Sequence, residues 1–551
     1  MNTRTRLGVL CVTLLACVSI AASSADAQQV EGIVFYDDNA NGIYDDGESG
    51  VSGVAVSDGA TLVTTDAQGR YELTTDDVAR FVFVCIPSGT QPVAQWYLPV
   101  SSDGPHDFPL ARISQEGPLV FVQVSDIHYA PTPEEFKLGL RDRQMEILPD
   151  PVLDTLCEEI DDISIDFVLL AGDLAADSKY PEPEVVDSWI GAMADRFATD
   201  IDAAVYGVIG NHDIIRDEAI GKTIYENYFG PTYYAFDIKG THFVVLDTQR
   251  LEGTKLVYTS TERQLAWLEQ DLAGVDQDTP IVVFCHEPSY DWVDTPEGEA
   301  LFALLQQAGI TALLNGHWHT NEVLREEPFY ELTSGAVCGA WWEGPGPDGS
   351  GFGYRVFRFA RGILDSIWRE SDGIDLSSPT EAVLTWADRL EAQVWGAMDA
   401  ASYAWDGGEP VSLDVYWNGL WSSVASNINV STLSDGYHEL EITFVDSEGS
   451  SISQYKSFMV SNLALTLEEI FDHPDTYQGK IVAAPELTVR AAMGSDISAY
   501  DDTETIIIGS FPYAVTRNDI IGLVGMYHPT SASPIKVYDE IFYTVYDGEE
   551  E

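Results

Sequence analysis

Two patterns of apolar residues alternate along the chain and predict two kinds of domain. In residues 28–113 and from residue 371 onward, short runs alternate apolar and polar positions and are separated by Gly and Asp-Gly turns, which predicts β-strands. Between these regions, wholly apolar runs alternate with amphipathic segments such as 149–163 and 260–275. That alternation predicts buried strands and helices, so residues 114–370 should form an α/β domain.

The β-rich regions divide further by the spacing of their strands. Residues 28–113 are expected to form a small β-sandwich, and residues 371–462 an immunoglobulin-like β-sandwich. Residues 463–551 open with one predicted helix, LTLEEIFDHP (465–474), and continue with about five strands and an acidic tail. This spacing predicts a small barrel of the OB kind.

Five apolar runs of the α/β region end in polar residues that bind metals. PLVFVQVSDIH ends in Asp126 and His128, IDFVLLAGD in Asp173, AAVYGVIGNHD in Asn211, His212 and Asp213, PIVVFCHEP in His286, and ITALLNGHWH in His317 and His319. Five of the ten histidines of the chain lie at these ends. A single such ending is ordinary loop chemistry, but the joint pattern predicts a metal site.

The carboxyl ends of strands in an α/β sheet point into one crevice, so these side chains can converge. Imidazole, carboxylate and amide ligands without a thiolate suit Mn, Fe, Zn or Ni. One ion would be over-coordinated by so many ligands. Two divalent ions that share a carboxylate would each keep room for water, an arrangement suited to in-line phosphoryl displacement.

The motifs DxH, GD, GNHD, an isolated His after an apolar strand and GHxH, in that order, resemble the calcineurin-like metallophosphoesterases. The resemblance implies a four-layer αββα sandwich as catalytic domain, here flanked by all-β domains, with the site at the strand ends. It implies that Asp126, His128 and His319 bind the first ion and that Asp173 bridges. Asn211, His286 and His317 would then hold the second ion.

The resemblance also implies catalytic roles for the rest of the GNHD motif. His212 would act as general acid, with Asp213 orienting and charging its ring, and a metal-bridging hydroxide would be the nucleophile. One position departs from a related group. Purple acid phosphatases carry a tyrosine three residues after the bridging aspartate, where this chain has Ala176. A tyrosinate–iron centre is therefore not expected.

A second ion site is predicted in the N-terminal β-sandwich. The segment DDNANGIYDDGE places oxygen-bearing side chains at the spacing of an EF-hand loop, namely Asp37, Asn39, Asn41, Asp45 and Glu48. The segment resembles calcium loops on β scaffolds of bacterial surface proteins, and an acidic turn without an ion is the alternative. We expect a structural Ca²⁺ here.

The charge of the chain excludes several partners. With 27 Lys+Arg against 90 Asp+Glu, the formal net charge is −63. Such a field repels nucleic acids and anionic membranes, so neither is an expected partner. Acidic residues scattered over the whole chain suit a salty medium, which favours a halophilic source.

The N-terminus resembles an export signal. Arg4 and Arg6 precede an apolar stretch that ends near the small-residue site Ala25-Asp26-Ala27, so residues 1–27 are predicted to be removed on secretion. Cys17 would instead be lipidated if LLAC is a lipoprotein box. The protein is thus expected to be secreted, periplasmic or on the cell surface. No later apolar run is long enough to be a transmembrane segment.

We therefore expect a secreted dimetal phosphoesterase that hydrolyses phosphate mono- or diesters, with small phosphate esters or glycan-linked phosphates as substrates. Trp318, Trp341 and Trp342 lie near the motifs and are expected either to stack on a leaving group or to pack in the core. A different class of function stays open. The β domains could make the chain a cell-surface glycan-binding protein, or adhesin, with an incidental phosphoesterase domain.

Overall fold

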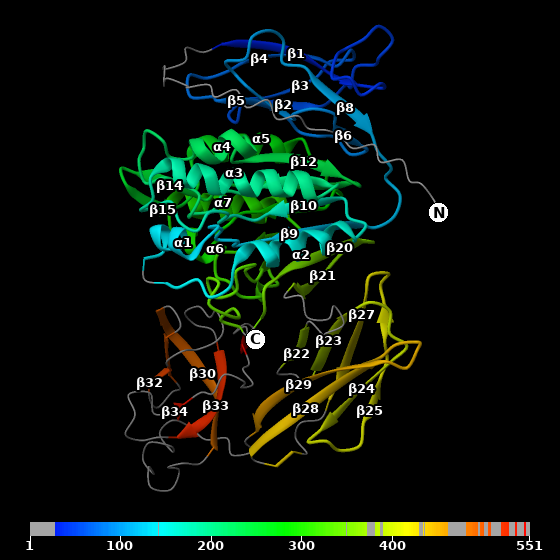
Figure 1. The fold of residues 1–551 in the computed structure, drawn as a ribbon, viewed down its shortest axis with the longest axis vertical. Helices are drawn as coiled ribbons and strands as arrows, with labels where there is room; N and C mark the ends of the chain where they lie inside the picture. Colours follow the sequence, from blue (N-terminus) through cyan, green and yellow to red (C-terminus); the bar gives the residue numbers. More distant parts are fainter. Residues whose placement is uncertain are drawn as a thin grey trace. The chain divides into compact units, whose positions relative to one another are not determined.

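The computed structural model describes residues 28–371 except Asp142 and Gly349, residues 381–460 except 386–388, 429–432 and 435, and only the strands from residue 481 onward. The predicted signal segment 1–27, with Cys17, and the predicted helix at 465–474 lie outside the described residues. The chain divides into two compact units, residues 1–372 and 373–551. Figure 1 shows the elements of both.

The first unit begins with two four-stranded β-sheets. Their strands are β1 (Gln29–Tyr36), β2 (Ala55–Ser57), β3 (Leu62–Thr64), β4 (Arg70–Thr74), β5 (Phe81–Val84), β6 (Thr90–Pro92), β7 (Tyr97–Pro99) and β8 (Phe108–Arg112). One sheet has the order β4-β1-β8-β6 and the other β3-β2-β5-β7. The alternation that predicted strands is visible in β4, where Tyr71 and Leu73 are buried and their neighbours are exposed.

Two larger sheets and a hairpin follow. Their strands are β9 (Leu119–Val124), β10 (Phe167–Leu170), β11 (Ala204–Gly207), β12 (Tyr234–Ile238), β13 (Thr241–Val245), β14 (Gln249–Glu252), β15 (Lys255–Tyr258), β16 (Ile281–Phe284), β17 (Ala312–Asn315), β18 (Glu322–Arg325), β19 (Tyr330–Thr333), β20 (Gly353–Ala360) and β21 (Ile363–Glu370). The first sheet has the order β11-β10-β9-β20-β21, the second β12-β13-β16-β17-β19-β18, and β14 pairs with β15.

The two sheets pack face to face through phenylalanines. Phe121 of β9 makes edge contacts with Phe243 of β13 and Phe284 of β16, at ring-centroid distances of 5.7 and 5.8 Å. Strands β9, β10, β16 and β17 are buried at every position, because each is covered on both faces. Wholly apolar runs, which cannot be told from buried helices by period alone, are strands here.

Helices cover the outer faces of the two sheets. They are α1 (Pro133–Gly139), α2 (Pro149–Asp161), α3 (Pro183–Asp200), α4 (Thr223–Phe229), α5 (Glu262–Ala273), α6 (Ser289–Trp292) and α7 (Pro296–Ala308). Helix α2 contacts β20 through Tyr354 and Glu159, and α5 contacts β13 through His242 and Asp271. The predicted αββα sandwich is therefore confirmed.

The N-terminal β-sandwich is packed against the αββα sandwich. Ile86 pairs with Phe236 of β12 in an isolated parallel bridge, and the Trp96 and Tyr234 rings lie 4.4 Å apart. Arg263 of α5 forms ion pairs with Asp58 and Asp76 across the same boundary. The two domains share one continuous apolar core, and so form one unit.

The second unit contains only β-strands among its described residues. They are β22 (Glu381–Thr385), β23 (Arg389–Trp395), β24 (Ala400–Trp405), β25 (Val411–Leu413), β26 (Tyr416–Trp417), β27 (Trp421–Asn427), β28 (Gly436–Val445), β29 (Ser451–Val460), β30 (Ile481–Met493), β31 (Asp496–Tyr500), β32 (Thr505–Ile508), β33 (Ile520–Tyr527), β34 (Ile535–Lys536) and β35 (Val545–Tyr546). Sheets β22-β23-β27-β26 and β25-β24-β28-β29 enclose a core that includes Val394, Leu440 and Phe444. The remaining strands form one sheet centred on β30 and β33.

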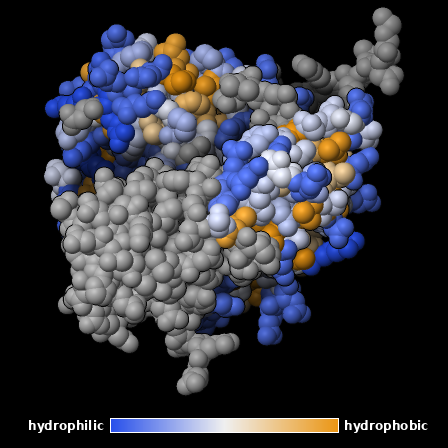
Figure 2. All heavy atoms as spheres, turned by 90° about the horizontal axis from the view of Figure 1, so that it is seen from below, coloured by the Kyte–Doolittle hydropathy of each residue, from blue (hydrophilic) through white to orange (hydrophobic). Residues whose placement is uncertain are grey.

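The surface reflects the acidic composition. On the face drawn in Figure 2, hydrophilic residues predominate in the described part, and hydrophobic residues lie in small separate groups. Among the described residues, no helix combines the length and the apolar character that crossing a bilayer requires.

Candidate metal centre

The loops that follow β9 and β10 carry the first three predicted ligands and are hydrogen-bonded to each other. The backbone N–H of Asp126 donates to the carbonyl of Gly172, and that of His128 to the carbonyl of Asp173, at 3.1 and 2.9 Å. Because β9 and β10 are parallel neighbours, the turns after them emerge side by side. The ligands of the DxH and GD motifs are thereby brought together.

Five predicted ligands adopt left-handed backbone angles that side chains other than glycine rarely take. Their φ angles are 55° at Asp126, 47° at His128, 53° at Asp173, 70° at His317 and 58° at His319. Each such residue is strained by about 1–3 kcal/mol, and clusters of this kind occur where side chains are held for function. Here the left-handed turns direct successive ligands toward a common point instead of alternate faces.

The motif glycines leave room for this convergence. A Cβ on Gly210 would lie 2.2 Å from Oδ1 of Asp173, and a Cβ on Gly316 would lie 1.9 Å from Oγ of Ser125. Ser125 donates to Oδ2 of Asp126 at 2.5 Å. Glycine is therefore required in GNHD and GHxH because a ligand, or the residue that orients it, occupies the space of a side chain.

The predicted ligands of the first ion lie within coordination reach of one another. Oδ1 of Asp126 is 3.9 Å from Nε2 of His128 and 3.5 Å from Nε2 of His319. The Nε2 atoms of the two histidines are 3.1 Å apart. These are the edge lengths of a coordination shell with bonds of about 2 Å.

Asp173 lies between the two predicted ion sites. Its Oδ2 is 3.0 Å from Nε2 of His286 and 3.7 Å from Nε2 of His128. His317 joins Asp173 and His286 in a second group whose ligand atoms all lie within 4.8 Å of one another. Asn211, the remaining predicted ligand, is buried at the start of the turn formed by the GNHD motif.

Backbone carbonyls fix the orientation of the ligand rings. Nδ1 of His286 donates to Ala171 at 2.7 Å, Nδ1 of His319 to Gly339 at 2.9 Å, and Nδ1 of His128 approaches Ala176 at 3.4 Å. In each ring the Nε2 atom is left to face the centre. This is the outer support that metal-binding histidines require.

The residues present fit two divalent ions, because several buried polar atoms have no other partner. Within the described chain, no hydrogen bond reaches Oδ1 of Asp126, Oδ1 of Asn211, Nε2 of His286 or Nδ1 of His317. Buried polar atoms are nearly always paired. These four atoms all belong to predicted ligands, and the contacts of Oδ1 of Asp126 and Nε2 of His286 are with other predicted ligands, as is expected of groups that bind cations.

Burial and mutual charge set the protonation of these groups. Burial, reinforced by His212, holds the pKa of His128 well below its usual range, and burial with His286 lowers the pKa of His317 to about 3. Burial opposes ionisation of Asp173, but His286 and His212 more than offset it and keep the pKa of that carboxyl well below normal. Burial also opposes a charge on His286, but Asp173 and Asp126 hold the pKa of that ring well above normal. Burial opposes a charge on His319 in the same way, and Cys338 with Asp126 raises its pKa well above normal. The centre thus presents ionised carboxylates, two neutral rings, and two rings from which a bound metal would displace a proton.

His212 lies at the edge of this group, but Asp213, its expected partner, forms hydrogen bonds with other residues. Nδ1 of His212 is 3.1 Å from the carbonyl of Ala176, and its ring contacts that of His128 at 4.7 Å. The carboxylate of Asp213 instead accepts from the backbone N–H groups of Leu174, Ala175 and Gly210. The expectation that Asp213 orients the ring is corrected: Asp213 pins the turns together, and Ala176 orients His212.

The tryptophans take three different roles. Trp342 is buried and its indole N–H donates to the carbonyls of Ile127 and His128. Trp341, half-buried with φ 61°, lies with its ring centroid 4.1 Å from that of His128, and Arg143 covers it at 5.1 Å. Trp318 donates to Asp291. Trp342 is thus a core residue, whereas Trp341 packs against the histidines that are predicted to bind the first ion.

Sequence reasoning missed three neighbours of the centre. Sγ of Cys338 lies 3.8 Å from Nδ1 of His319, on the side of the ring away from Asp126. Oδ1 of Asp177 lies 3.7 Å from Nδ1 of His212. Arg216 donates to the carbonyl of Asn211 at 3.1 Å. In the sequence, Asp177 follows the GD motif closely and Arg216 follows the GNHD motif closely. This proximity is the only sequence signal that could have identified these two residues.

A second cluster of possible metal ligands lies where the two domains of the first unit meet. Cys85, Asp237 and His242 approach one another there. Both ring nitrogens of His242 already contact carboxylates, Nδ1 with Asp237 at 2.7 Å and Nε2 with Asp271 at 2.9 Å. This arrangement is an ion triad, buried at His242 and Asp271 and partly exposed at Asp237, that is satisfied without a metal.

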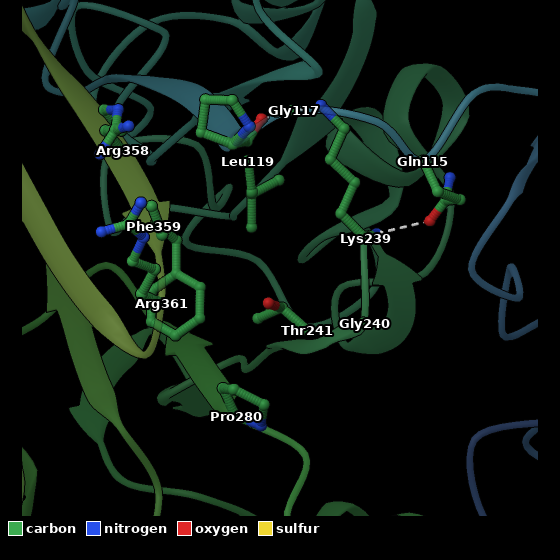
Figure 3. A pocket seen from close by; sticks show the side chains of 12 residues that line it. Gln115, Gly117, Leu119, Lys239, Gly240, Thr241, Pro280, Arg358, Phe359 and Arg361 are labelled. Carbon is green, nitrogen blue, oxygen red and sulfur yellow. Dashed lines mark hydrogen bonds between the residues drawn. The ribbon is translucent and has the colours of Figure 1, made fainter. Parts of the chain in front are cut away.

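The cavity in Figure 3 is remote from the metal centre. It measures about 490 Å³ and is lined by residues at the amino ends of β9, β13 and β16, among them Leu119, Thr241 and Pro280. Predicted ligands follow the opposite, carboxyl ends of β9 and β16. Lys239, which borders the cavity, donates to Asp166 and to the carbonyl of Pro118.

Comparison with known families agrees with this geometry. The family model described as calcineurin-like phosphoesterase matches residues 119–321, which contain all seven predicted metal ligands. Residues 119–321 belong to the calcineurin-like phosphoesterase family. A second model, described as the N terminal of calcineurin-like phosphoesterase, matches residues 38–110, so the β-sandwich before the phosphoesterase domain is also typical of such proteins. By family, this domain is a metal-dependent phosphoric ester hydrolase.

Two curated relatives resemble part of the chain. Purple acid phosphatase 23 of Arabidopsis thaliana is 30% identical over 26% of this chain and 34% of its own length. Serine/threonine-protein phosphatase CPPED1 of Mus musculus is 30% identical over 22% of this chain and 44% of its own length. The chain thus spans less than half of either relative. A solved dimetal phosphatase from Danio rerio is 16% identical, with a TM-score of 0.33 over 45% of this chain and 99% of its own.

The loop predicted to bind calcium is folded around its own side chains. Asp37 accepts from the backbone N–H groups of Asn41 and Gly42, at 3.2 and 2.7 Å. The side-chain amides of Asn39 and Asn41 both donate to Asp45, and Glu48 accepts from the backbone of Asp45. The five predicted ligands are therefore neighbours, and calcium binding stays a prediction.

Proposed function

We propose that this protein is a dimetal phosphoesterase that hydrolyses small phosphate esters. The convergence of Asp126, His128, Asp173, Asn211, His286, His317 and His319, with four of their buried ligand atoms lacking any other partner, carries the proposal. The family of residues 119–321 supports the reaction class.

In this proposal Asp126, His128 and His319 hold one ion, Asn211, His286 and His317 hold the other, and Asp173 joins both. When bound, such ions supply Lewis acidity toward the phosphoryl oxygens and make a water nucleophilic at neutral pH. The chain contributes a fixed frame, because the rings of His128, His286 and His319 are each held from behind by a backbone carbonyl. A frame of this kind loses little free energy to reorganisation during the reaction.

His212 is the proposed general acid. Its Nδ1 faces the carbonyl of Ala176, which leaves Nε2 as the atom to deliver a proton to the leaving oxygen. The side chain is 15% exposed, so a substrate can reach it. The backbone N–H of His212 donates to Asp173 at 2.7 Å, which couples the position of the acid to the shared carboxylate.

Small esters are the proposed substrates because of charge. A chain with a formal charge of −63 repels polyanions but admits a small phosphate ester or a phosphate carried on a neutral glycan. The N-terminal pattern at residues 1–27 supports a secreted protein, and the scattered acidic residues support a halophilic one.

The test is hydrolysis by the full chain. Purified protein supplied with Mn²⁺ should bind two ions and hydrolyse p-nitrophenyl phosphate or bis-p-nitrophenyl phosphate. His438→Ala, in the second unit, is the matched histidine control and should keep full activity, whereas His286→Ala should lose it. Two bound ions with no turnover of either ester, together with binding to glycans, would instead support the adhesin.

We also propose a structural Ca²⁺ at the loop of Asp37, Asn39, Asn41, Asp45 and Glu48, supported by the gathering of these side chains. Calcium should raise the melting temperature of the wild-type protein but not that of Asp37→Ala. An equal rise in both proteins would contradict the site.

A further inference from the structure

Arg216 lies beside the metal centre and, among the residues that the structure describes, forms no ion pair with a carboxylate, unlike several other arginines of the chain. The guanidinium groups of Arg80, Arg196, Arg250, Arg263 and Arg325 all form ion pairs. In the described part of the chain no ion pair includes Arg216, although acidic residues outnumber basic ones by 90 to 27. The positive charge of Arg216, beside the metal centre, therefore has no carboxylate partner among the described residues.

The guanidinium is also incompletely hydrogen-bonded. Nη2 of Arg216 donates to the carbonyl of Asn211 at 3.1 Å, which fixes the side chain against the GNHD turn. Nη1 is buried and has no hydrogen-bond partner among the described residues. A buried charged donor without a partner costs about 1–3 kcal/mol or more. Such a donor is available to bind an anion.

The position of Arg216 is on the side of the second ion. Its anchor, Asn211, is a predicted ligand of that ion. The ring of Tyr258 contacts His317, another ligand of the same ion, at 5.5 Å. Burial together with Glu287 raises the pKa of the Tyr258 phenol, and the charge of Arg216 acts on it in the opposite direction. Tyr258 therefore contacts a predicted ligand of the second ion and lies within electrostatic range of Arg216.

We propose that Arg216 binds a non-bridging oxygen of the phosphoryl group through Nη1, and that it makes the site selective for phosphate monoesters over diesters. The inference rests on the proposed phosphoesterase function and deepens it. A monoester has a terminal phosphoryl group with three unsubstituted oxygens and up to two negative charges. It can engage both ions and still offer an anionic oxygen to a fixed guanidinium. A diester has one unsubstituted oxygen fewer and half the charge.

The role differs from that of the metal ligands, because arginine stays protonated and does not coordinate cations. Removal of the guanidinium should therefore leave the ions in place. It should weaken every phosphate ligand that uses the third oxygen. Inorganic phosphate, the simplest such ligand, is a suitable probe that does not depend on turnover.

The test compares Arg216→Gln and Arg216→Lys with Arg250→Gln in the full-length, metal-loaded protein. Arg250 is the matched control because its guanidinium is paired with Glu252 and Glu297. Metal content, phosphate affinity by calorimetry and kcat/KM on the two p-nitrophenyl esters are measured. Arg216→Gln should keep two ions, bind phosphate about 10–100-fold more weakly and lose a similar factor on the monoester. It should lose less on the diester, while Arg216→Lys recovers part of the affinity and Arg250→Gln matches wild type.

Unchanged phosphate affinity in Arg216→Gln would overturn the proposal, and so would an equal loss on both esters. Loss of an ion in Arg216→Gln and Arg216→Lys would also overturn it, because Arg216 would then serve to position Asn211. Failure of the wild-type protein to hydrolyse either ester would refute the proposed function separately, since phosphate binding is measured without turnover.

Discussion

The Nε2 atoms of His128 and His319 lie 3.1 Å apart although 191 residues separate them in the chain. His128 follows β9 of the five-stranded sheet, and His319 follows β17 of the six-stranded sheet. The centre therefore joins the two halves of the sandwich at one end. Ions bound between these rings would hold the sheets together as well as support catalysis.

Metal removal is thus expected to destabilise the first unit. Because the ions bind the folded centre and not the unfolded chain, free ions at about 100 times their Kd should contribute about 2.7 kcal/mol. The melting temperature, followed by tryptophan fluorescence, should fall on dialysis against EDTA and recover with Mn²⁺. A melting temperature that does not respond to metal would contradict a centre that links the sheets.

Asp173→Asn should lose both ions and activity together. The amide keeps an oxygen in the place of Oδ1, which accepts from the backbone N–H of His212, but replaces the anionic Oδ2 that faces His286 and His128. We expect the metal content to fall below one ion per chain and kcat/KM to fall at least about 100-fold, because both ions lose their shared ligand. Retention of two ions would refute the bridging role.

His212→Ala should separate metal binding from turnover. The side chain is not among the predicted ligands, so the variant should keep two ions by elemental analysis. Loss of a positioned general acid should lower kcat by about 10²–10⁴-fold on substrates with poor leaving groups. The loss should be smaller on p-nitrophenyl phosphate, whose leaving group needs little protonation. A variant that loses an ion would make His212 a ligand.

Trp341→Ala should make the first ion easier to remove. The indole lies against the rings of His128, His319 and His212, at 4.1, 4.8 and 5.3 Å, and shields them from water. Stopped-flow transfer of metal to a chromogenic chelator should become faster for one of the two ions. Trp318→Ala, which removes a ring that donates to Asp291, is the control and should leave both rates unchanged.

The ion triad at His242 should make stability depend on pH. Burial opposes its charge, but hydrogen bonds to Asp237 and Asp271 raise its pKa from 6.5 to about 9. Because the pKa is higher in the folded state, the contribution is complete below pH 6.5 and is lost as the pH rises to about 9. It amounts to on the order of 3 kcal/mol. The melting temperature of wild type should fall over this interval more steeply than that of His242→Gln, and parallel curves would contradict the assignment.

The ligands at the strand ends and the α/β fold class could be predicted from the local pattern of apolar and polar residues. Apolar runs that end in Asp, Asn or His are visible in the sequence, and parallel strands must bring their carboxyl ends to the same edge. The family resemblance then divided the seven residues between two ions. The N-terminal sandwich was equally predictable, because positions such as Tyr71 and Leu73 alternate with exposed neighbours.

Only the tertiary structure decided which partners the side chains contact. Asp213 stands next to His212 in the chain, yet it accepts from the backbone of Leu174, Ala175 and Gly210, while Ala176 orients the ring. Trp341 packs against the ring of His128, whereas its neighbour Trp342 is buried in the core. Hydrogen-bond choice and burial depend on groups that are distant in sequence, whereas the period of apolar residues records only the local backbone. For the same reason the free Nη1 of Arg216 became evident only when its surroundings were known.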